Sequence, residues 1–288
     1  ADPRVRYTFR MLTFGQAALL GILQGVAELF PVSSLGHTVL VPALLDWQIN
    51  EASGGFVAFV VATHAATALA LLLFFWRDWL NIISGILRSL KTRTLAHDPY
   101  ARLGWLLIIA TIPAGLLGLA LQNFFTTLFG AATLVACALI VNGIVLFAAE
   151  KLRTRKPQGA TSDATSSQMT FGRGFAIGCA QALALIPGLS RTGLAMTGGM
   201  LNGLSHEDAA RFSFLLATPV IGAAAVLKLP DLLKSGGDVP AALLGAACAF
   251  VAALVSTRFL TRYFRTRTLK PFAWYCIVAG LLALAILH

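Results

Sequence analysis

Charged residues are scarce in this sequence: Asp, Glu, Lys and Arg together make up only 12% of its 288 residues, against about 25% in an ordinary soluble domain. So few charges cannot cover the surface of a water-soluble protein, which excludes the soluble classes. Apolar residues instead account for 57% of the chain, and the mean hydropathy is +0.78. Because lipid tails accept apolar side chains on the outer face of a protein, the composition predicts an integral membrane protein.

Acidic residues and cysteines are also few. The 12 Asp and Glu residues stand against 22 Lys and Arg residues, which gives a net charge of +10. The positive residues lie in short segments between apolar runs and not on one amphipathic face, so they indicate membrane topology and exclude a nucleic-acid partner. The cysteines lie inside apolar runs without CxxC spacing, so we expect no metal or disulfide role for them. They are Cys137, Cys179, Cys248 and Cys276.

Long apolar runs dominate the rest of the chain. Six stretches are long and apolar enough to span a bilayer: 56–76, 103–121, 130–149, 209–229, 240–260 and 271–288. Two others, 14–45 and 171–204, are interrupted by Pro, Gly, Ser and a charged or titratable residue. We expect each to form two half-helices that enter the membrane and return, which requires protein or a wet cavity around the exposed backbone. The predicted fold class is an all-α polytopic membrane protein with six transmembrane helices and two re-entrant helix hairpins.

The two interrupted stretches match each other, which indicates an internal repeat. A shift of 157 positions superimposes Gly15 on Gly172, Gly21 on Gly178, Gln24 on Gln181, Ala27 on Ala184, Ser33 on Ser190 and Gly36 on Gly193. We predict a single membrane domain in which repeat one (about 14–150) and repeat two (about 172–288) are joined by a flexible polar cytoplasmic linker at about 151–171. Each repeat has three spans, an odd number, so the second repeat enters from the opposite side. The result is an inverted-topology repeat whose interrupted segments meet near the membrane centre.

Basic residues indicate the orientation of this bundle. Under the six-span prediction they concentrate after the first, third and fifth spans, all on one side. The opposing segments, 122–129 and 230–239, hold only Lys234 between them. Short loops rich in Lys and Arg stay in the cytoplasm. The first interrupted segment is therefore predicted to open toward the periplasm.

The first interrupted segment carries an unusual polar cluster. It reads Gln24-Gly-Val-Ala-Glu28-Leu-Phe-Pro31-Val-Ser33-Ser34-Leu-Gly36-His37. Gln24 and Glu28 share one helix face, Pro31 ends that helix, and His37 starts the returning half after a Ser/Gly turn. A glutamate inside an apolar segment usually faces a cavity and a partner. Glu28 and His37 could simply pair as a structural contact, but the adjoining hydroxyls, glycine turn and helix N-terminus favour a functional site.

The second interrupted segment has the features of a phosphate site. It reads Gln181-Ala-Leu-Ala-Leu-Ile-Pro187-Gly188-Leu-Ser190-Arg191-Thr192-Gly193. At the N-terminus of a half-helix, backbone N–H groups, the helix dipole and hydroxyls all favour an anion. Arg191 adds a permanently charged, bidentate guanidinium. It could instead be a topology charge, but it lies far from both ends of the apolar stretch.

Together the two half-sites contain the groups that phosphoryl hydrolysis requires. Arg191 and the helix N-termini would neutralise phosphate oxygens, and Glu28 would orient a group or bind a divalent cation. Ser34, His37 or water could be the nucleophile, or His37 could transfer a proton, and the residues leave this choice open. The predicted phosphate-binding residues are Ser33, Gly36, Gly188, Ser190, Arg191, Thr192 and Gly193.

The two motifs, together with Arg211-Phe-Ser-Phe-Leu-Leu-Ala, resemble the bacterial undecaprenyl-diphosphate phosphatase family of the bacitracin-resistance type. The resemblance runs from about residue 14 to the C-terminus. It implies hydrolysis of undecaprenyl diphosphate, or a related lipid diphosphate, to the monophosphate and inorganic phosphate. The reaction would take place at a periplasm-facing site in the bacterial inner membrane, aided by Mg²⁺ or Ca²⁺, and would recycle the lipid carrier of cell-wall synthesis. The sequence leaves monomer and homodimer open.

The resemblance also implies residue roles. Glu28 would be the essential acid, Ser34 and His37 the candidates for nucleophile or proton transfer, and Arg191 the diphosphate clamp. Gln24 stands where a second Glu is common, so a metal here would be held by Glu28 and Gln24 and not by two carboxylates. Leu35 and Thr192 replace the more usual Thr and Ser. His64 stands in an apolar span where the family has Gln. Together with Gln181 it is a candidate accessory residue of the site. These departures indicate a divergent member of the family.

A second interpretation is a lipid-phosphate transporter or flippase. Inverted repeats with broken helices at the membrane midplane are typical of secondary transporters. Transport would use Arg191 and helix dipoles to hold the anion, but it needs no nucleophile beside an acid–base pair. The cluster around Ser34 and His37 therefore favours the hydrolase, and a purely structural role would leave Glu28 and Arg191 without a purpose.

Overall fold

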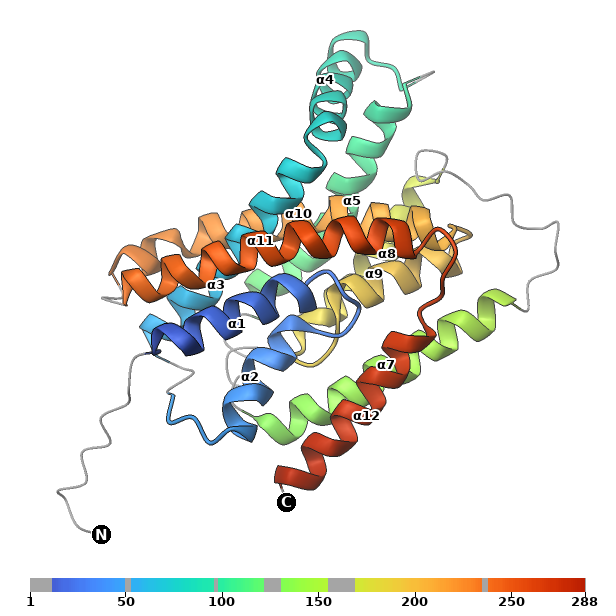
Figure 1. Ribbon diagram of the computed structural model, residues 1–288. Helices are drawn as coiled ribbons and strands as arrows, with labels where there is room; N and C mark the ends of the chain where they lie inside the picture. Colours follow the sequence, from blue (N-terminus) through green and yellow to red (C-terminus); the bar gives the residue numbers. More distant parts are fainter. Residues whose placement is uncertain are drawn as a thin grey trace, which may run out of the picture.

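The computed structural model describes residues 12–49, 53–95, 98–121, 131–154, 169–234 and 238–287. In these ranges the regular structure is entirely helical (Figure 1). Six of the described helices are long and apolar enough to cross a membrane, which confirms the six predicted spans. They are α3 (Gly54–Phe74), α5 (Pro99–Ala120), α7 (Ala132–Thr154), α10 (His206–Lys234), α11 (Val239–Tyr263) and α12 (Lys270–Leu287). The segment 122–129 and most of the predicted linker lie outside the described residues.

Each interrupted segment forms two short helices with a turn between them. They are α1 (Phe14–Ala27) with α2 (Ser34–Leu44), and α8 (Phe171–Ala182), continued by the 3₁₀ turn η2 (Leu183–Leu185), with α9 (Arg191–Leu201). An 11-residue helix such as α2 or α9 is about 16 Å long, roughly half the hydrocarbon thickness. The helix α2 begins at Ser34 and not, as predicted, at His37, because the Ser33 hydroxyl caps it by accepting a hydrogen bond from the Gly36 N–H.

The segment after the first span is a helix, where the sequence analysis expected a basic loop. This helix, α4 (Trp76–Thr92), begins directly after a break at Phe75. It packs against the start of α5, where Gly85 approaches Ala101 so closely that a Cβ on Gly85 would lie 2.6 Å from the Ala101 nitrogen. Figure 1 shows α4 and the first part of α5 projecting together from the other helices. The expectation failed because α4 is amphipathic, and its charges keep it below the hydropathy of a span.

The helix contacts follow a twofold pattern between the two repeats. The helix α1 packs on α11 as α8 packs on α5, α2 contacts α12 as α9 contacts α7, and α3 pairs with α10. Gly21 and Gly178, which the 157-residue shift superimposes, make equivalent close approaches. A Cβ on Gly21 would lie 2.2 Å from the Gly245 oxygen, and one on Gly178 would lie 2.4 Å from the Ala110 oxygen. The repeated sequence thus builds repeated packing.

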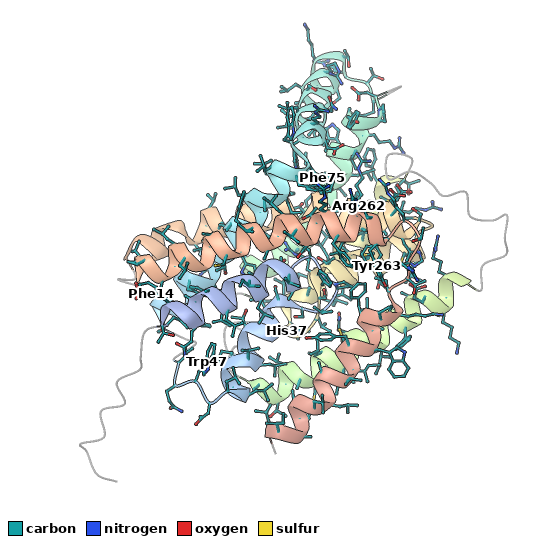
Figure 2. The ribbon with its side chains drawn as sticks, in the orientation of Figure 1. Phe14, His37, Trp47, Phe75, Arg262 and Tyr263 are labelled. Atoms are coloured by element: carbon teal, nitrogen blue, oxygen red, sulfur yellow. The ribbon has the colours of Figure 1, made fainter. Side chains whose placement is uncertain are left out.

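The ends of the bundle differ in charge. In Figure 2, Phe14 and Trp47 lie toward one end, and Arg262 and Tyr263 lie at the end where α11 turns toward α12. Ion pairs join basic residues of α4, α10 and the segment after α11 to nearby acids, at the side predicted to be cytoplasmic. They are Arg211–Asp78 (2.5 Å), Arg88–Asp98 (2.8 Å) and Arg265–Glu207 (3.1 Å).

Candidate active site

The turns of the two interrupted segments meet inside the bundle, and each is capped by a serine. Ser33 accepts a hydrogen bond from the Gly36 N–H at 3.2 Å, and Ser190 accepts one from the Gly193 N–H at 3.1 Å. The turns are in contact, because a Cβ on Gly36 would lie 3.2 Å from the Gly188 Cα. The helices α2 and α9 therefore begin next to each other. Their free N–H groups and positive dipole ends converge on one region, which favours an anion there.

Glu28 lies at this junction with both carboxylate oxygens bound. One oxygen, Oε1, accepts a hydrogen bond and an ion pair from Arg191. The other, Oε2, accepts hydrogen bonds from the Ser34 hydroxyl and from Gln24 Nε2 (3.0 Å), and it lies 3.3 Å from His64 Nε2. Glu28 is buried, with 6% of its surface exposed. The carboxylate thus joins the catalytic candidates of repeat one to the phosphate clamp of repeat two.

The histidine that contacts Glu28 is His64, the accessory candidate, and not His37, the catalytic candidate. His64 on α3 contacts Glu28, and its Nδ1 lies 2.8 Å from the Val60 carbonyl oxygen. His37 on α2 (Figure 2) instead lies with Nδ1 2.6 Å from the Ser33 carbonyl oxygen and Nε2 2.7 Å from the Tyr275 hydroxyl, stacked on that ring. The structural pairing of Glu28 with His37 is therefore not formed.

A cavity of about 310 Å³ opens at this junction. Its polar lining consists of Glu28, Ser33, Ser34, His64, Gln181, Ser190, Arg191 and Lys228. The other side chains of the lining are apolar, and most of them come from α3, α10 and the η2 segment. They include Val60, Val61, Ala114, Leu185, Val220, Ile221 and Ala224. The cavity therefore combines a polar end with an apolar wall, as a lipid phosphate requires. His37 lies outside this lining.

Other predicted residues hold the two turns in place. The Thr192 hydroxyl donates a hydrogen bond to the Glu28 carbonyl oxygen at 2.8 Å, which ties the second turn to the first. Gly188 has a φ of 100°, and a Cβ there would lie 2.5 Å from the Val135 oxygen, so the position requires glycine. Ser33, with a φ of 70°, has an unusual backbone for a non-glycine residue. Gln181 lines the cavity and donates to the Ala110 carbonyl oxygen at 2.9 Å.

Asn142 on α7 joins both turns and was missed by the sequence analysis. Its Nδ2 donates a hydrogen bond to the Pro31 carbonyl oxygen at 2.9 Å, and its Oδ1 accepts one from the Ser190 N–H at 3.0 Å. The side chain is fully buried. The sequence did contain a signal: Asn142 is a single amide within the apolar run 130–149. Polar residues inside spans are costly, and they usually face the interior of the bundle and bind a partner there. Lys228 in the cavity and Tyr275 beside His37 were missed as well.

The side chains of this site do not fit a divalent cation bound by Glu28 and Gln24. Mg²⁺ and Ca²⁺ prefer several oxygen ligands, but Glu28 is the only carboxylate among the described residues that line the cavity, and both its oxygens already accept hydrogen bonds. Gln24 presents its N–H to Glu28, and its buried Oε1 has no hydrogen-bond partner among the described residues. In this arrangement Gln24 presents a donor to Glu28, which a cation would have to displace. The described residues also contain no cluster of three His, Cys, Asp or Glu side chains that could hold a metal.

Comparison with known proteins identifies the family of this chain. The family model described as "Bacitracin resistance protein BacA" matches residues 17–282. An undecaprenyl-diphosphatase of Mycolicibacterium paratuberculosis is 48% identical over 93% of this chain and 95% of its own length. That of Granulibacter bethesdensis is 47% identical over 95% and 96%, and undecaprenyl-diphosphatase 2 of Frankia alni is 43% identical over 94% and 97%. These matches confirm the resemblance carried by the two motifs: the chain belongs to the BacA family of bacitracin resistance proteins.

Proposed function

We propose that this protein is an undecaprenyl-diphosphatase, which hydrolyses undecaprenyl diphosphate to undecaprenyl phosphate and inorganic phosphate. The observation that carries the proposal is the contact of Ser34, Glu28 and Arg191 at the polar end of a cavity with an apolar wall. These three groups are a hydroxyl, a base and an anion clamp. Membership of the BacA family and relatives named undecaprenyl-diphosphatase support the same activity.

The cavity suits the two parts of such a lipid. The diphosphate would lie at the polar end, facing Arg191 and the N-termini of α2 and α9, where charge and backbone N–H groups stabilise phosphate oxygens. The polyprenyl chain would follow the apolar wall between α3 and α10. Such a wall contributes affinity without selecting chain length, because apolar contact is not directional.

The hydrogen bond from Ser34 to Glu28 supports a two-step reaction. The Ser34 oxygen attacks the terminal phosphorus as its proton passes to Glu28. The bond from that phosphorus to the bridging oxygen breaks, and undecaprenyl phosphate leaves with the bridging oxygen. Water then attacks the phosphoserine and its protons leave with the inorganic phosphate, while the proton held by Glu28 returns to the Ser34 oxygen as the phosphorus–oxygen bond to Ser34 breaks. Arg191 stabilises the charge on the phosphoryl oxygens in both steps.

His37 has no direct part in this reaction. It lies outside the cavity lining, between the Ser33 carbonyl group and Tyr275. By fixing Ser33 it would hold the turn that presents Ser34, which makes His37 a positioning residue. No step is assigned to a divalent cation, because the side chains around Glu28 do not fit one.

We place the site on the periplasmic side of a bacterial inner membrane. The basic residues after α3, α7 and α11 would lie in the cytoplasm, and the turn of α1 and α2 would open toward the opposite side. There it would meet the diphosphate that cell-wall synthesis releases, and its activity would recycle the lipid carrier and confer resistance to bacitracin.

The test is phosphate release from undecaprenyl diphosphate by the purified protein in detergent. We expect release by the wild type, loss of release in Ser34→Ala, and retention in the control Ser84→Ala, whose hydroxyl bonds only within α4. Substrate labelled in its terminal phosphate should leave label on Ser34 when the reaction is quenched with acid. Binding of the lipid without release in the wild type would refute the hydrolase and favour the transporter.

A further inference from the structure

The ring of His37 is held between two groups that fix its orientation. Its Nδ1–H donates a hydrogen bond to the Ser33 carbonyl oxygen at 2.6 Å, because a carbonyl group can only accept. Its Nε2 lies 2.7 Å from the Tyr275 hydroxyl, and the two rings are stacked with their centroids 5.7 Å apart. A hydroxyl both donates and accepts, so this contact forms whatever the charge of the imidazole. His37 therefore joins the last span, α12, to the turn that precedes Ser34.

The turn that His37 contacts has a strained backbone at Ser33. Its φ of 70° is unusual for a non-glycine residue, and such a conformation persists only where the surrounding structure holds it. The Ser33 hydroxyl accepts a hydrogen bond from the Gly36 N–H, and its carbonyl oxygen accepts from the main-chain N–H and from Nδ1 of His37. Because Ser34 is the next residue and its hydroxyl donates to Glu28, a change in this turn would move the proposed nucleophile.

The helix α12 contacts the same turn at a second point. Cys276, which follows Tyr275, is buried, and its Sγ–H donates a weak hydrogen bond to the Pro31 carbonyl oxygen at 3.8 Å. That carbonyl oxygen and Cys276 Sγ both accept from Asn142 Nδ2, at 2.9 Å and 3.3 Å. Two consecutive residues of α12 therefore reach the two ends of the turn, Pro31 directly and Ser33 through the histidine ring.

The matching positions of the second repeat hold apolar residues. A shift of 137 positions superimposes α7 on α12, and the residues it matches make reciprocal close approaches: Gly143 with Gly280, and Ala136 with Ala273. Under this shift Tyr275 matches Ala138, and under the 157-residue shift His37 matches Leu194. The polar pair thus stands in the repeat that carries Ser34, which favours a role in presenting the nucleophile over a general role in packing.

We infer that Tyr275 is a positioning residue for the proposed hydrolysis: by holding the ring of His37 against Ser33, it fixes the turn that presents Ser34 to the substrate. This inference rests on the proposed function and adds a residue of the last span to its site. Tyr275 acts through His37 and the turn, and it does not touch the reacting atoms.

Two other roles for Tyr275 make different predictions. Its side chain is 47% exposed on the surface of the bundle, where aromatic residues commonly face lipid. A tyrosine that only faces lipid would tolerate Phe without any change in turnover. A hydroxyl that relays a proton through His37 would instead alter the pH dependence of kcat when it is removed.

The test compares Tyr275→Phe with Tyr263→Phe in phosphate release from undecaprenyl diphosphate by purified protein in detergent. Tyr275→Phe keeps the stacked ring and removes only the hydroxyl. The hydroxyl of Tyr263 donates to the Thr268 carbonyl oxygen at 3.3 Å, outside the cavity lining, so Tyr263→Phe should equal the wild type. In Tyr275→Phe we expect kcat to fall about tenfold, the factor that one hydrogen bond corresponds to. KM and the shape of the pH profile should not change, because the groups that bind the phosphate are intact.

A double variant tests whether Tyr275 acts through His37. In His37→Ala, kcat should fall by about 10²-fold, the cost of a reacting group misplaced by about 1 Å. Adding Tyr275→Phe to His37→Ala should cause no further loss, because the partner of the hydroxyl is already missing. Losses that simply multiply, wild-type kcat in Tyr275→Phe, or a shifted pH profile would each overturn the inference.

Hydrogen exchange gives a measure of the turn that needs no turnover. The protection of the Gly36 amide, which donates to Ser33, should fall in Tyr275→Phe and not in Tyr263→Phe. The equivalent amide of the second repeat, that of Gly193, should keep its protection in both variants. Equal protection of Gly36 in Tyr275→Phe and the wild type would refute the positioning role. If no protein releases phosphate, the proposed function fails, and exchange at Gly36 still decides whether Tyr275 holds the turn.

Discussion

The ion pair between Glu28 and Arg191 should affect stability and activity in ways that can be separated. Both side chains are largely buried, with exposed fractions of 5% and 16%. Removing one partner of a buried pair leaves an uncompensated charge and costs about 3–5 kcal/mol. In Arg191→Met, Glu28 keeps Gln24, Ser34 and His64 as partners. We therefore expect a loss in the free energy of unfolding near the low end, about 3 kcal/mol.

Neutralising the second partner should restore most of this loss. In the double variant Glu28→Gln/Arg191→Met no unpaired charge remains, and the net cost should fall to about 1 kcal/mol, the value of an ordinary hydrogen bond. Phosphate release should nevertheless be absent from Arg191→Met and from the double variant, because the guanidinium that binds the phosphate is missing from both. Stability would return while activity would not.

The assay is reversible unfolding in mixed micelles by SDS titration, followed by circular dichroism, for the wild type, both single variants and the double variant. The four free energies form a double-mutant cycle that isolates the pair from its surroundings. Ser84→Ala serves as the control for handling, since its hydroxyl bonds only within α4. If the losses of the single variants simply add in the double variant, the two side chains do not interact and the electrostatic description of the site is wrong.

Three further changes test the structure around the site. Asn142→Leu removes the partner of one main-chain group in each turn, so the free energy of unfolding should fall by about 2–4 kcal/mol and phosphate release should fall with it; equal stability would refute the bridge. Gly21→Leu should separate α1 from α11 and lower the unfolding midpoint, whereas Gly15→Ala, with nothing within 4 Å of its Cβ position, should not. The N–H of Ala101 and the charge of Arg88 lower the pKa of Asp98 from its ordinary 3.8. Its stabilising contribution is therefore complete above that pH and is lost as the pH falls below it. The protection of amides at the α4–α5 end from hydrogen exchange, measured relative to their intrinsic rate at each pH, should therefore fall in acid in the wild type and not in Asp98→Asn.

Local chemistry explains why the spans and the broken segments could be predicted. An apolar run of about 20 residues is long enough to cross a bilayer, and Pro31 and Pro187, which stand among Gly and Ser residues in the two broken segments, disfavour one continuous helix there. The serine caps could be predicted on the same grounds, because the 157-residue shift pairs Ser33 with Ser190 and both cap the third N–H that follows. These features depend on a few neighbouring residues.

Features that depend on packing between distant segments could not be predicted. Both His37 and His64 lie in apolar helices, and the sequence does not show which of them faces Glu28, because that depends on how each helix is rotated in the bundle. The structure turns His37 toward Tyr275, 238 positions later, and His64 toward Glu28. Asn142 is also separated from both of its turns by long stretches of chain. The helix α4 was not predicted for a different reason, because its basic residues suggested a loop.

The repeat makes the site nearly symmetric in its backbone and asymmetric in its chemistry. Ser34 and Arg191, 157 positions apart, are each the first residue of a half-helix that follows a capping serine. One repeat therefore places a hydroxyl, and the other a guanidinium, at equivalent positions beside the same cavity. Glu28 matches Leu185 under the same shift, so the base is present only once. A carrier that holds an anion between two related halves would be served by similar groups on both, whereas phosphoryl transfer needs a nucleophile, a base and a clamp that differ. The divergence of Ser34 from Arg191 within a shared framework is therefore an argument for hydrolysis over transport.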